Sequence, residues 1–348
     1  MHRECILRID MQAAVDWRAA RPSVRRGPAL PRSAAAPTLG DMTRIGIVTT
    51  SPTAFTSADP DRDCAPLVAS LGARGIEAAS LDWHDPAVDW ARWDLVVLRS
   101  PWDYAQHAEE FAAWLDRTGA ATRVLNAPEL VRWNMDKRYL AELEAAGIAV
   151  IPTSYHREEA SLGDALATAA GGGDGGGAPS EDAAHVVIKP AVGAGSQRTG
   201  LFAADDPAAL DLARQILAAG GTVMLQPEVT ELSAGEEKAL YTLDGRFTHA
   251  VAKGALLARG GGLRGGEYLE RPELVEASGA ERAFAERVLA AVAEVTGLET
   301  PLYGRIDLVD SAEHGLALLE AELFEPTYNL HLAPEVTEQF VDAILARV

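Results

Sequence analysis

Residues 185–200 read HVVIKPAVGAGSQRTG, an apolar strand that ends at Lys189 and is followed by a loop with Gly193, Gly195 and Gly200. Glycine allows backbone N–H groups to come close to a ligand, and a lysine at a strand end adds a positive charge for phosphate oxygens. The segment therefore predicts a phosphate-binding loop. The alternative interpretation is an ordinary flexible turn between two strands.

Two better-known phosphate loops do not fit this segment. In a Walker A loop the lysine follows the last glycine, whereas Lys189 precedes the glycines. A dinucleotide-binding loop requires the pattern G-x-G-x-x-G, and the last position of that pattern, counted from Gly193, holds Arg198. A phosphate site here therefore requires a different fold.

A second lysine precedes this segment in the chain. Trp133-Asn134-Met135-Asp136-Lys137 opens a helix predicted over residues 136–147, which puts Lys137 in the first turn. The helix dipole disfavours a cation at this position, and a bound phosphate would reverse that cost. The alternative is a solvated surface lysine, which is the commoner situation for a single Lys.

Acidic residues near the end of the chain have the spacing of a metal site. Residues 303–309 read YGRIDLV, and strand alternation puts Arg305 and Asp307 on one face. A turn near residues 312–315 predicts that this strand forms a hairpin with the next one. The hairpin would bring Asp307 alongside the acidic residues of the second strand.

The second strand of this hairpin lies in residues 316–325, which read LALLEAELFE. Alternation puts Glu320 and Glu322 on one face and predicts that Glu325 points away. Like charges two residues apart in an apolar strand are costly unless a cation or water relieves them. Together with Asp307 they offer the oxygen ligands that Mg²⁺ prefers beside phosphates. The alternative is a solvent-facing strand of acids.

Two kinds of lobe are expected along the chain. The first, residues 42–126, is a doubly wound parallel sheet, because its strands are nearly continuously apolar and alternate with helices. Its strands are predicted at residues 44–49, 76–81, 94–98 and 123–125, and its helices at 63–74 and 109–117. The rest reads as α+β, with strands at 185–189, 222–226, 238–243, 247–253, 302–309 and 316–324 and helices at 278–296 and 335–347.

The remaining segments complete the predicted organisation. Residues 1–41 carry seven Arg against four acids and are expected to be a disordered arm or to precede the natural start at Met42. Residues 171–180 read GGGDGGGAPS and predict a flexible loop, and residues 258–267 predict a mobile lid, with a plain disordered loop as the alternative. Residues 127–230 would form linker helices and a small lobe, and residues 231–348 a large lobe with the metal site.

Composition narrows the classes of partner. The chain has 348 residues, a formal net charge of −20 and 48% hydrophobic residues, so it can bury a substantial core. A strongly acidic surface disfavours nucleic acid, and no apolar run is long enough to cross a membrane. Two cysteines without metal-ligand spacing fit a reducing cytoplasm. Homo-oligomerisation is left open by these numbers.

The ordered set of motifs resembles the ATP-grasp superfamily over about residues 42–346. The order is more specific than any single motif. The matching pieces are Asn134-Met135-Asp136-Lys137, Val187-Ile188-Lys189-Pro190 with its glycine loop, Met224-Leu225-Gln226-Pro227-Glu228, Glu237-Lys238-Ala239-Leu240, Asp244-Gly245, Arg305-Ile306-Asp307 and Glu320-Ala321-Glu322. The resemblance implies an ATP-grasp fold with an N-terminal pre-ATP-grasp lobe, and ATP with Mg²⁺ (or Mn²⁺) as cofactors.

The resemblance also implies roles for individual residues. Arg305 and Lys189 would act on the transferred phosphoryl group, and Asp307, Glu320 and Glu322 would hold the metal ion. Many relatives have Asn where Glu322 stands, so this metal site would be one charge more acidic. The nucleotide would be bound by Lys137, Lys189, Gly193, Gly195, Ser196, Gln226, Glu228, Val229 and Lys238.

Within the superfamily, the chain resembles the glutathione-synthetase-like branch and, in detail, the O-ureidoserine cyclo-ligases of cycloserine biosynthesis. This closer resemblance rests on residues 99–104, 244–251 and 322–326. It implies a ligase that activates a small amino-acid-like carboxylate as an acyl phosphate for attack by an amine-type nucleophile, with cyclisation as one option. The alternatives are a regulatory or scaffold protein with decayed catalysis and a phosphotransferase.

The substrate pocket is expected at the end of the strand predicted at residues 94–98, because ligands gather at the carboxyl ends of parallel strands. Arg99 would bind a substrate carboxylate, and its replacement by Ala would raise the KM for that substrate more than for ATP. The alternative is an Arg–acid pair that fixes the loop. Trp102, Asp103, Tyr104 and Asn329 are assigned to the same pocket.

Overall fold

The computed structural model describes residues 43–51, 61–171, 184–264 and 271–348. The arm predicted over residues 1–41, nearly all of the glycine-rich loop at 171–180 and the end of the predicted lid lie outside the described residues. Each strand and helix predicted from the sequence is present, with ends shifted by a few residues. No helix in the described part is both long enough and apolar enough to span a membrane.

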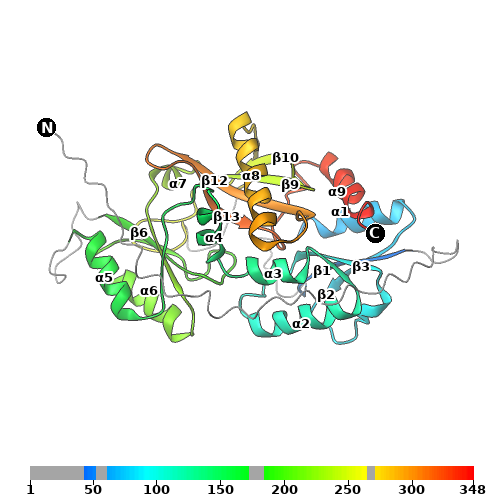
Figure 1. Cartoon of the computed structure of the whole chain (residues 1–348), viewed down its shortest axis with the longest axis horizontal. Helices are drawn as coiled ribbons and strands as arrows, with labels where there is room; N and C mark the ends of the chain where they lie inside the picture. The colour runs from blue at the N-terminus through cyan, green and yellow to red at the C-terminus, as the bar shows by residue number, and fades with distance from the viewer. Residues whose placement is uncertain (1–42, 52–60, 172–183, 265–270) are drawn as a thin grey trace. The chain divides into compact units, whose positions relative to one another are not determined.

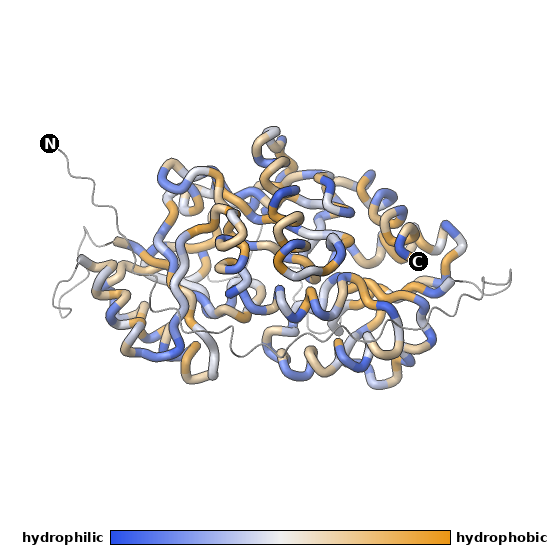
Figure 2. The backbone as a smooth tube through the Cα atoms, viewed as in Figure 1, coloured by the Kyte–Doolittle hydropathy of each residue, from blue (hydrophilic) through white to orange (hydrophobic). Residues whose placement is uncertain are grey.

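The first sheet is parallel and has the strand order β2-β1-β3-β4. Its strands are β1 (Arg44–Thr49), β2 (Glu77–Asp82), β3 (Leu95–Ser100) and β4 (Arg123–Leu125). Alternate residues of β1 and β3 pack against α1 (Cys64–Ala73) and α9 (Glu335–Leu345) on one face and against α2 (Ala108–Ala121) on the other. Because both faces are covered, the central residues of both strands are apolar, Ile45, Ile47 and Val48 in β1 and residues 95–98 in β3 (Figure 2), as the doubly wound prediction requires.

The second sheet is antiparallel and has the order β5-β8-β6-β7. Its strands are β5 (Ser154–His156), β8 (Val223–Pro227), β6 (His185–Pro190) and β7 (Gly200–Ala203). Helices α5 (Glu159–Ala169) and α6 (Pro207–Ala218) lie together on this sheet (Figure 1) and share its apolar core. The predicted phosphate-binding loop connects β6 to β7, which pair as neighbours.

The third sheet is antiparallel and has the order β11-β10-β9-β12-β13. Helix α8 (Gly279–Thr296) covers one face and begins with a capping box between Ser278 and Glu281. The strands are β9 (Lys238–Leu243), β10 (Arg246–Ala252), β11 (Glu273–Val275), β12 (Tyr303–Ser311) and β13 (Gly315–Glu322). The turn between β12 and β13 ends at Gly315, whose φ of +65° suits glycine.

Short helical elements connect the sheets. They are η4 (Trp90–Arg92), α3 (Pro128–Asn134), α4 (Tyr139–Ala145) and α7 (Thr230–Ala234). The single helix predicted over residues 136–147 is wrong at its start, because α4 begins only at Tyr139 and Lys137 lies in the turn before it. The helix-dipole argument for Lys137 therefore does not apply.

Residues 323–330, which follow β13, are held along their backbone by side chains distant in sequence. Four side chains donate to consecutive carbonyl groups, and one carboxylate accepts from two N–H groups. The pairs are Asn126 with Leu323 at 2.5 Å, Tyr303 with Phe324 at 2.8 Å, Trp102 with Glu325 at 2.7 Å, Arg99 with Pro326 at 2.6 Å, and Asp63 with Tyr328 at 2.5 Å and Leu330 at 2.9 Å. The segment that follows β13, the strand with Glu320 and Glu322, is thereby tied to residues of the first lobe and, through Tyr303, to β12.

Candidate active site

A cleft with about 1140 Å³ of empty space, its open mouth included, lies between the second and third sheets. Most of the residues predicted to bind nucleotide and metal line it, although they come from strands far apart in the sequence. These residues are Lys137, Lys189, Gly193, Gly195, Ser196, Gln226, Glu228, Val229, Asp307, Glu320 and Glu322. The tertiary structure therefore brings together the lysines, the glycine loop and the carboxylates.

Lys137 joins the glycine loop to the carboxylate strand. Its Nζ donates to the Gly193 carbonyl at 2.6 Å and lies 3.0 Å from Glu320 Oε1. Burial alone would lower the pKa of Lys137, but the ion pair with Glu320 outweighs burial and the pKa is raised. Lys137 is therefore a charged group at the point where the loop meets the acids.

Lys189 is the second buried lysine, and its surroundings differ from those of Lys137. It forms no ion pair with any residue that the structure describes, and burial together with the nearby Lys137 and Lys253 charges lowers its pKa despite the attraction of Glu320. A cation without a direct partner in a cavity suits an anionic ligand, because the ligand then supplies the missing counter-charge.

Asp307 is a buried carboxylate held by two cations. Arg305 donates to it through two nitrogens at 2.8 Å, and Lys253 Nζ lies 3.0 Å away. Burial would raise the pKa of Asp307, but these two cations lower it to about 2. The strand alternation predicted for Arg305 and Asp307 is confirmed, because both side chains lie on the same face.

Glu320 and Glu322 complete the acidic face as the hairpin prediction requires. Asp307 is opposite Glu320 and Arg305 is opposite Glu322 in the β12–β13 register. Burial favours the neutral form of both, yet Lys137 and Lys189 keep the pKa of Glu320 low. Glu322 has its pKa raised well above the ordinary value by burial and neighbouring carboxylates, although Arg305 Nη2 lies only 2.5 Å away.

Glu325 corrects one prediction. It lines the cavity rather than pointing away, because regular strand geometry ends at Glu322 and alternation no longer applies beyond it. Its side chain is buried, and Tyr104 Oη lies 3.5 Å from Oε1. Burial raises the pKa of Glu325 to about 7, against the attraction of Lys137.

Replacing Glu325 with Gln is expected to change the pH dependence of stability. Because the folded-state pKa is raised from 4.5 to about 7, the wild-type carboxyl contributes its full stability below about pH 4.5 and loses it as the pH rises through 7. Relative to wild type, the free energy of unfolding of the Gln variant should rise by up to about 3 kcal/mol between pH 5 and pH 8. Urea unfolding of both proteins at the two pH values measures this, and a pH-independent difference would contradict it.

Residues 226–229, at the end of β8, include three of the residues predicted to bind the nucleotide, and we call this segment the hinge. Gln226, Glu228 and Val229 line the cavity with the apolar side chains of Ile151 and Val187. Glu228 accepts from Ser233 Oγ at 2.6 Å and from Arg259 Nε at 3.0 Å, and these contacts lower its pKa although burial raises it. This carboxylate is therefore held in place at the mouth of the cleft.

The described part of the predicted lid contacts the second sheet. The Leu201 N–H donates to the Gly261 carbonyl at 2.9 Å, and the Gly260 N–H donates to the Leu201 carbonyl at 2.8 Å. Arg264 donates to the Ser233 carbonyl at 3.0 Å. Since Arg259 also pairs with Glu228, the segment bridges β7 and the hinge.

Lys238 does not reach the cleft, which corrects its assignment to the nucleotide. Its ammonium group lies 2.8 Å from Glu281 at the start of α8. Strand alternation explains this position, since Lys238 shares a face of β9 with Leu240, which packs in the α8 core. Glu237 and Ala239 lie on the opposite side, and Glu237 lines the cavity.

None of the five residues assigned to the substrate pocket, which are Arg99, Trp102, Asp103, Tyr104 and Asn329, lines this cleft. Trp102 binds the Glu325 backbone, Asp103 accepts from Trp83 and His84, and buried Asn329 donates to the Tyr241 hydroxyl at 2.9 Å. Arg99 is only 1% exposed and lies 3.5 Å from Asp63. The alternative interpretation of Arg99, an Arg–acid pair, agrees better with this geometry than direct substrate binding does.

Replacing Arg99 with Ala is expected to destabilise the fold by about 3–5 kcal/mol, because it removes one partner of a buried pair. The guanidinium group also lies 4.7 Å from the centre of the Tyr303 ring and holds the Pro326 carbonyl. Urea unfolding measures the loss, and Arg92→Ala, at an exposed Arg of the same region, is the control. If the free energy of unfolding changes by less than about 1 kcal/mol and the KM rises for the substrate but not for ATP, Arg99 binds substrate instead.

Sequence reasoning missed three charged residues of the cleft. They are Lys253, Glu237 and Glu325. The Lys253 Nζ lies 3.0 Å from an oxygen of Asp307 and 3.0 Å from an oxygen of Glu237. Lys253 stands at the end of a predicted strand, but only the pairing of β10 with β9, and of β9 with β12, brings it to Asp307. No local pattern could have revealed that contact.

The charges that line the cleft fit a metal–nucleotide complex. Six carboxylates face three lysines, so the lining attracts a divalent cation, while the lysines and the glycine loop suit phosphate oxygens. The lysines are Lys137, Lys189 and Lys253, and the carboxylates are Glu228, Glu237, Asp307, Glu320, Glu322 and Glu325.

Comparisons with known proteins agree with this geometry. Residues 45–126 match the family described as D-cycloserine synthetase DcsG, N-terminal domain. The chain is 37% identical over 291 residues to the cycloserine biosynthesis protein DcsG of Streptomyces lavendulae, covering 83% of this chain and 94% of that protein. The crystal structure of D-cycloserine synthetase DcsG matches with a TM-score of 0.77 and 33% identity, covering 87% of this chain and 99% of that one.

More distant structures share the fold. The D-alanine–D-alanine ligase from Bacillus anthracis, complexed with ATP, matches with a TM-score of 0.58 and 13% identity, over 87% of this chain and 96% of that one. The ATP-grasp ligase PsnB, complexed with a phosphomimetic variant of its minimal precursor, Mg and ADP, matches with a TM-score of 0.55 and 19% identity, over 88% of this chain and 99% of that one. The predicted ATP-grasp fold is confirmed, and the chain belongs to the DcsG family of ATP-grasp enzymes and is an ATP-dependent ligase.

Proposed function

We propose that this ligase activates the carboxylate of a small amino-acid-like substrate and joins it to an amine-type nucleophile. Ring closure of an O-ureidoserine-like substrate is the specific reaction that the relationship to DcsG favours. The observation that carries the proposal is the convergence of Lys137, Lys189, Asp307 and Glu320 in one cleft of a chain 37% identical to that relative.

Bound ATP with Mg²⁺, or Mn²⁺, would supply the phosphoryl group that converts the substrate carboxylate into an acyl phosphate. In this proposal Asp307, Glu320 and Glu322 hold the metal ion, because they share one face with their oxygens turned into the cleft. Lys137 and Lys189 hold phosphate oxygens, with the backbone of Gly193, Gly195 and Ser196 beside them.

The adenine end would be bound by the hinge, with Gln226 and Val229 offering backbone groups and Glu228 close to the base or ribose. Ile151 and Val187 provide apolar walls for a flat ring system. Arg259, which is paired with Glu228, keeps that carboxylate in a fixed position. The predicted lobes, residues 42–126, 127–230 and 231–348, are part of this proposal.

Arg305 and Lys253 stabilise the charge that develops during phosphoryl transfer. Both are buried beside Asp307, where a low local dielectric strengthens their effect. Arg305 stays charged, because Asp307 and Glu322 raise its pKa well above the ordinary value although burial opposes this. These groups position and neutralise charge, and no nucleophilic side chain is required.

A phosphate-release assay over a substrate panel tests the proposal. The panel contains both enantiomers of O-ureidoserine, free amino acids and hydroxamate derivatives, each with ATP and Mg²⁺. A ligase releases ADP and phosphate only when its carboxylate and nucleophile are both present. Mass spectrometry should then detect a product that is one water lighter than the reactants that were joined. A stable phosphorylated product would instead identify a phosphotransferase, and no turnover with the whole panel would favour a regulatory or scaffold role.

A further inference from the structure

A second group of potential ligands lies at the carboxyl ends of the strands of the first sheet, outside the cleft. His84 follows β2, and Asp103 and His107 follow β3. Successive strand ends meet at one edge of a parallel sheet, which is where open α/β sheets hold their ligands. Neither the cleft nor the proposed ligase reaction uses these residues.

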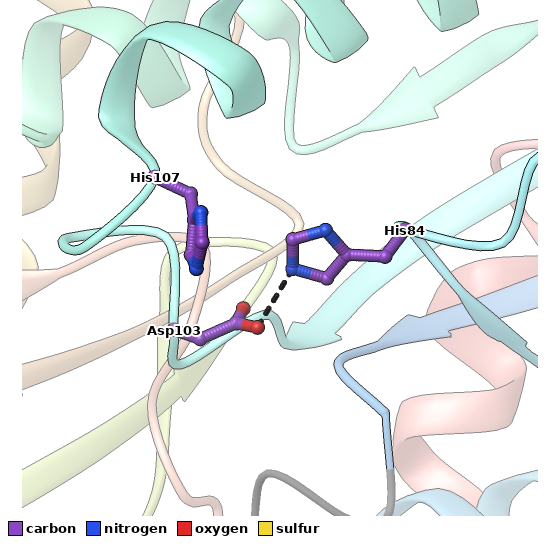
Figure 3. A group of neighbouring side chains, drawn as sticks. All are labelled: His84, Asp103 and His107. Carbon is purple, nitrogen blue, oxygen red and sulfur yellow. Dashed lines mark hydrogen bonds and ion pairs between the residues drawn. The ribbon is translucent and has the colours of Figure 1, made fainter.

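The three side chains converge on a small volume. Figure 3 shows both imidazole rings turned toward the Asp103 carboxylate from different sides. One potential ligand atom of each residue lies within 4.8 Å of the others, and His84 Nε2 is 2.8 Å from Asp103 Oδ2. No hydrogen bond joins His107 to Asp103 among those of the described residues, so hydrogen bonding alone does not account for the approach of the second ring.

Each of the three side chains is also oriented by an outer partner. Asp103 accepts from Trp83 Nε1 at 2.9 Å and from Thr50 Oγ1 at 2.5 Å.

Glu110, in the first turn of α2, lies beside both histidines. Its Oε1 lies 3.6 Å from His84 Nδ1, and its Oε2 lies 3.5 Å from His107 Nδ1. A bound ion would replace the contact of His84 Nε2 with Asp103, and a carboxylate beside Nδ1 favours the tautomer with its proton on Nδ1 and its lone pair on Nε2, which is the arrangement that metal-ligating histidines adopt. One carboxylate therefore lies next to Nδ1 of both rings.

We propose that His84, Asp103 and His107 bind a divalent transition-metal ion of the Zn²⁺ class, with water completing the coordination. Two imidazoles and one carboxylate suit such an ion, whereas the all-oxygen set of Asp307, Glu320 and Glu322 suits Mg²⁺. The ion has a path from solvent, because the side chains of His84 and His107 are 26% and 45% exposed. This proposal is independent of the ligase reaction.

Zn²⁺ binding to the untagged full chain tests the site. Equilibrium dialysis in excess Mg²⁺, which saturates the oxygen site, should give about one bound Zn²⁺ per chain. Cobalt as a spectroscopic probe should show visible absorption bands of a site with nitrogen ligands. His107→Gln, at a partly exposed position that tolerates the change, should weaken Zn²⁺ binding at least about tenfold and remove those bands.

Matched variants separate a metal site from a hydrogen-bonded cluster. Glu110→Gln should weaken Zn²⁺ binding about tenfold or more, because it removes the outer carboxylate, whereas Glu109→Gln, on the adjacent exposed residue, should leave it unchanged. His314→Gln, in the β12–β13 turn, controls for nonspecific binding by histidine. No Zn²⁺ bound by the wild type in excess Mg²⁺, or equal binding by wild type and the His84→Gln/His107→Gln double variant, would overturn the proposal.

Discussion

Replacing Lys189 with Met is expected to lower kcat/KM for ATP at least about a hundredfold while leaving the free energy of unfolding unchanged or higher. Lys189 lies in the cleft without an ion-pair partner among the described residues, and burial already lowers its pKa. Removing the charge should therefore cost the empty fold little, because Lys189 forms no direct ion pair among the described residues and Glu320, which it attracts, keeps its ion pair with Lys137. When ATP is bound, by contrast, loss of the Lys189 charge would leave phosphate oxygens without a counter-charge.

Lys238→Met is the matched control for this experiment. Lys238 is paired with Glu281 beside α8 and lies outside the cleft, so its loss should cost at most about 1 kcal/mol of stability and leave kcat/KM unchanged. Steady-state phosphate release and urea unfolding on the three proteins provide both quantities. A similar kcat/KM for ATP in the two variants would contradict a role for Lys189 in nucleotide binding.

Replacing Asp307 with Asn is expected to reduce turnover about a thousandfold and to destabilise the fold by about 3–5 kcal/mol. Asp307 is 1% exposed and faces two cations, Arg305 at 2.8 Å and Lys253 at 3.0 Å. Asn keeps the shape of the side chain but removes a carboxylate shared by two buried cations, of which Arg305 keeps its pair with Glu322 and Lys253 keeps its pair with Glu237. It also removes a charged oxygen from the proposed metal site.

The two effects of Asp307→Asn can be separated. Adding Lys253→Met should recover only part of the lost stability, because it removes one of the two cations that lost a counter-charge but also breaks the ion pair with Glu237, and it should not recover turnover. Asp310→Asn, at an exposed residue of the same strand, should change stability by less than about 0.5 kcal/mol. Turnover is measured at a temperature where circular dichroism shows every variant folded. A folded Asp307→Asn enzyme with near wild-type turnover would exclude Asp307 from the metal site.

Several features of the site could be predicted because they depend on local periodicity. Alternation along a strand correctly put Arg305 with Asp307 and Glu320 with Glu322, and a short turn ending at Gly315 brought the two pairs together. The same alternation stopped being informative after β13, where irregular backbone turns Glu325 into the cleft. Lys137 shows the same limit, since a chain turn rather than a helix start positions it.

The sequence by itself determined the parallel first sheet, the glycine loop after Lys189 and the shared face of Asp307, Glu320 and Glu322. These features follow from burial and from the two-residue period of a strand, which neighbouring residues are sufficient to specify. Only the tertiary structure decided which side chains from other elements meet them. It brought Lys253 to Asp307, directed Lys238 to α8, buried Arg99 beside Tyr303 and gathered His84, Asp103 and His107 at one sheet edge. Such contacts depend on strand order, register and packing between segments up to about 200 residues apart, and no local pattern encodes them.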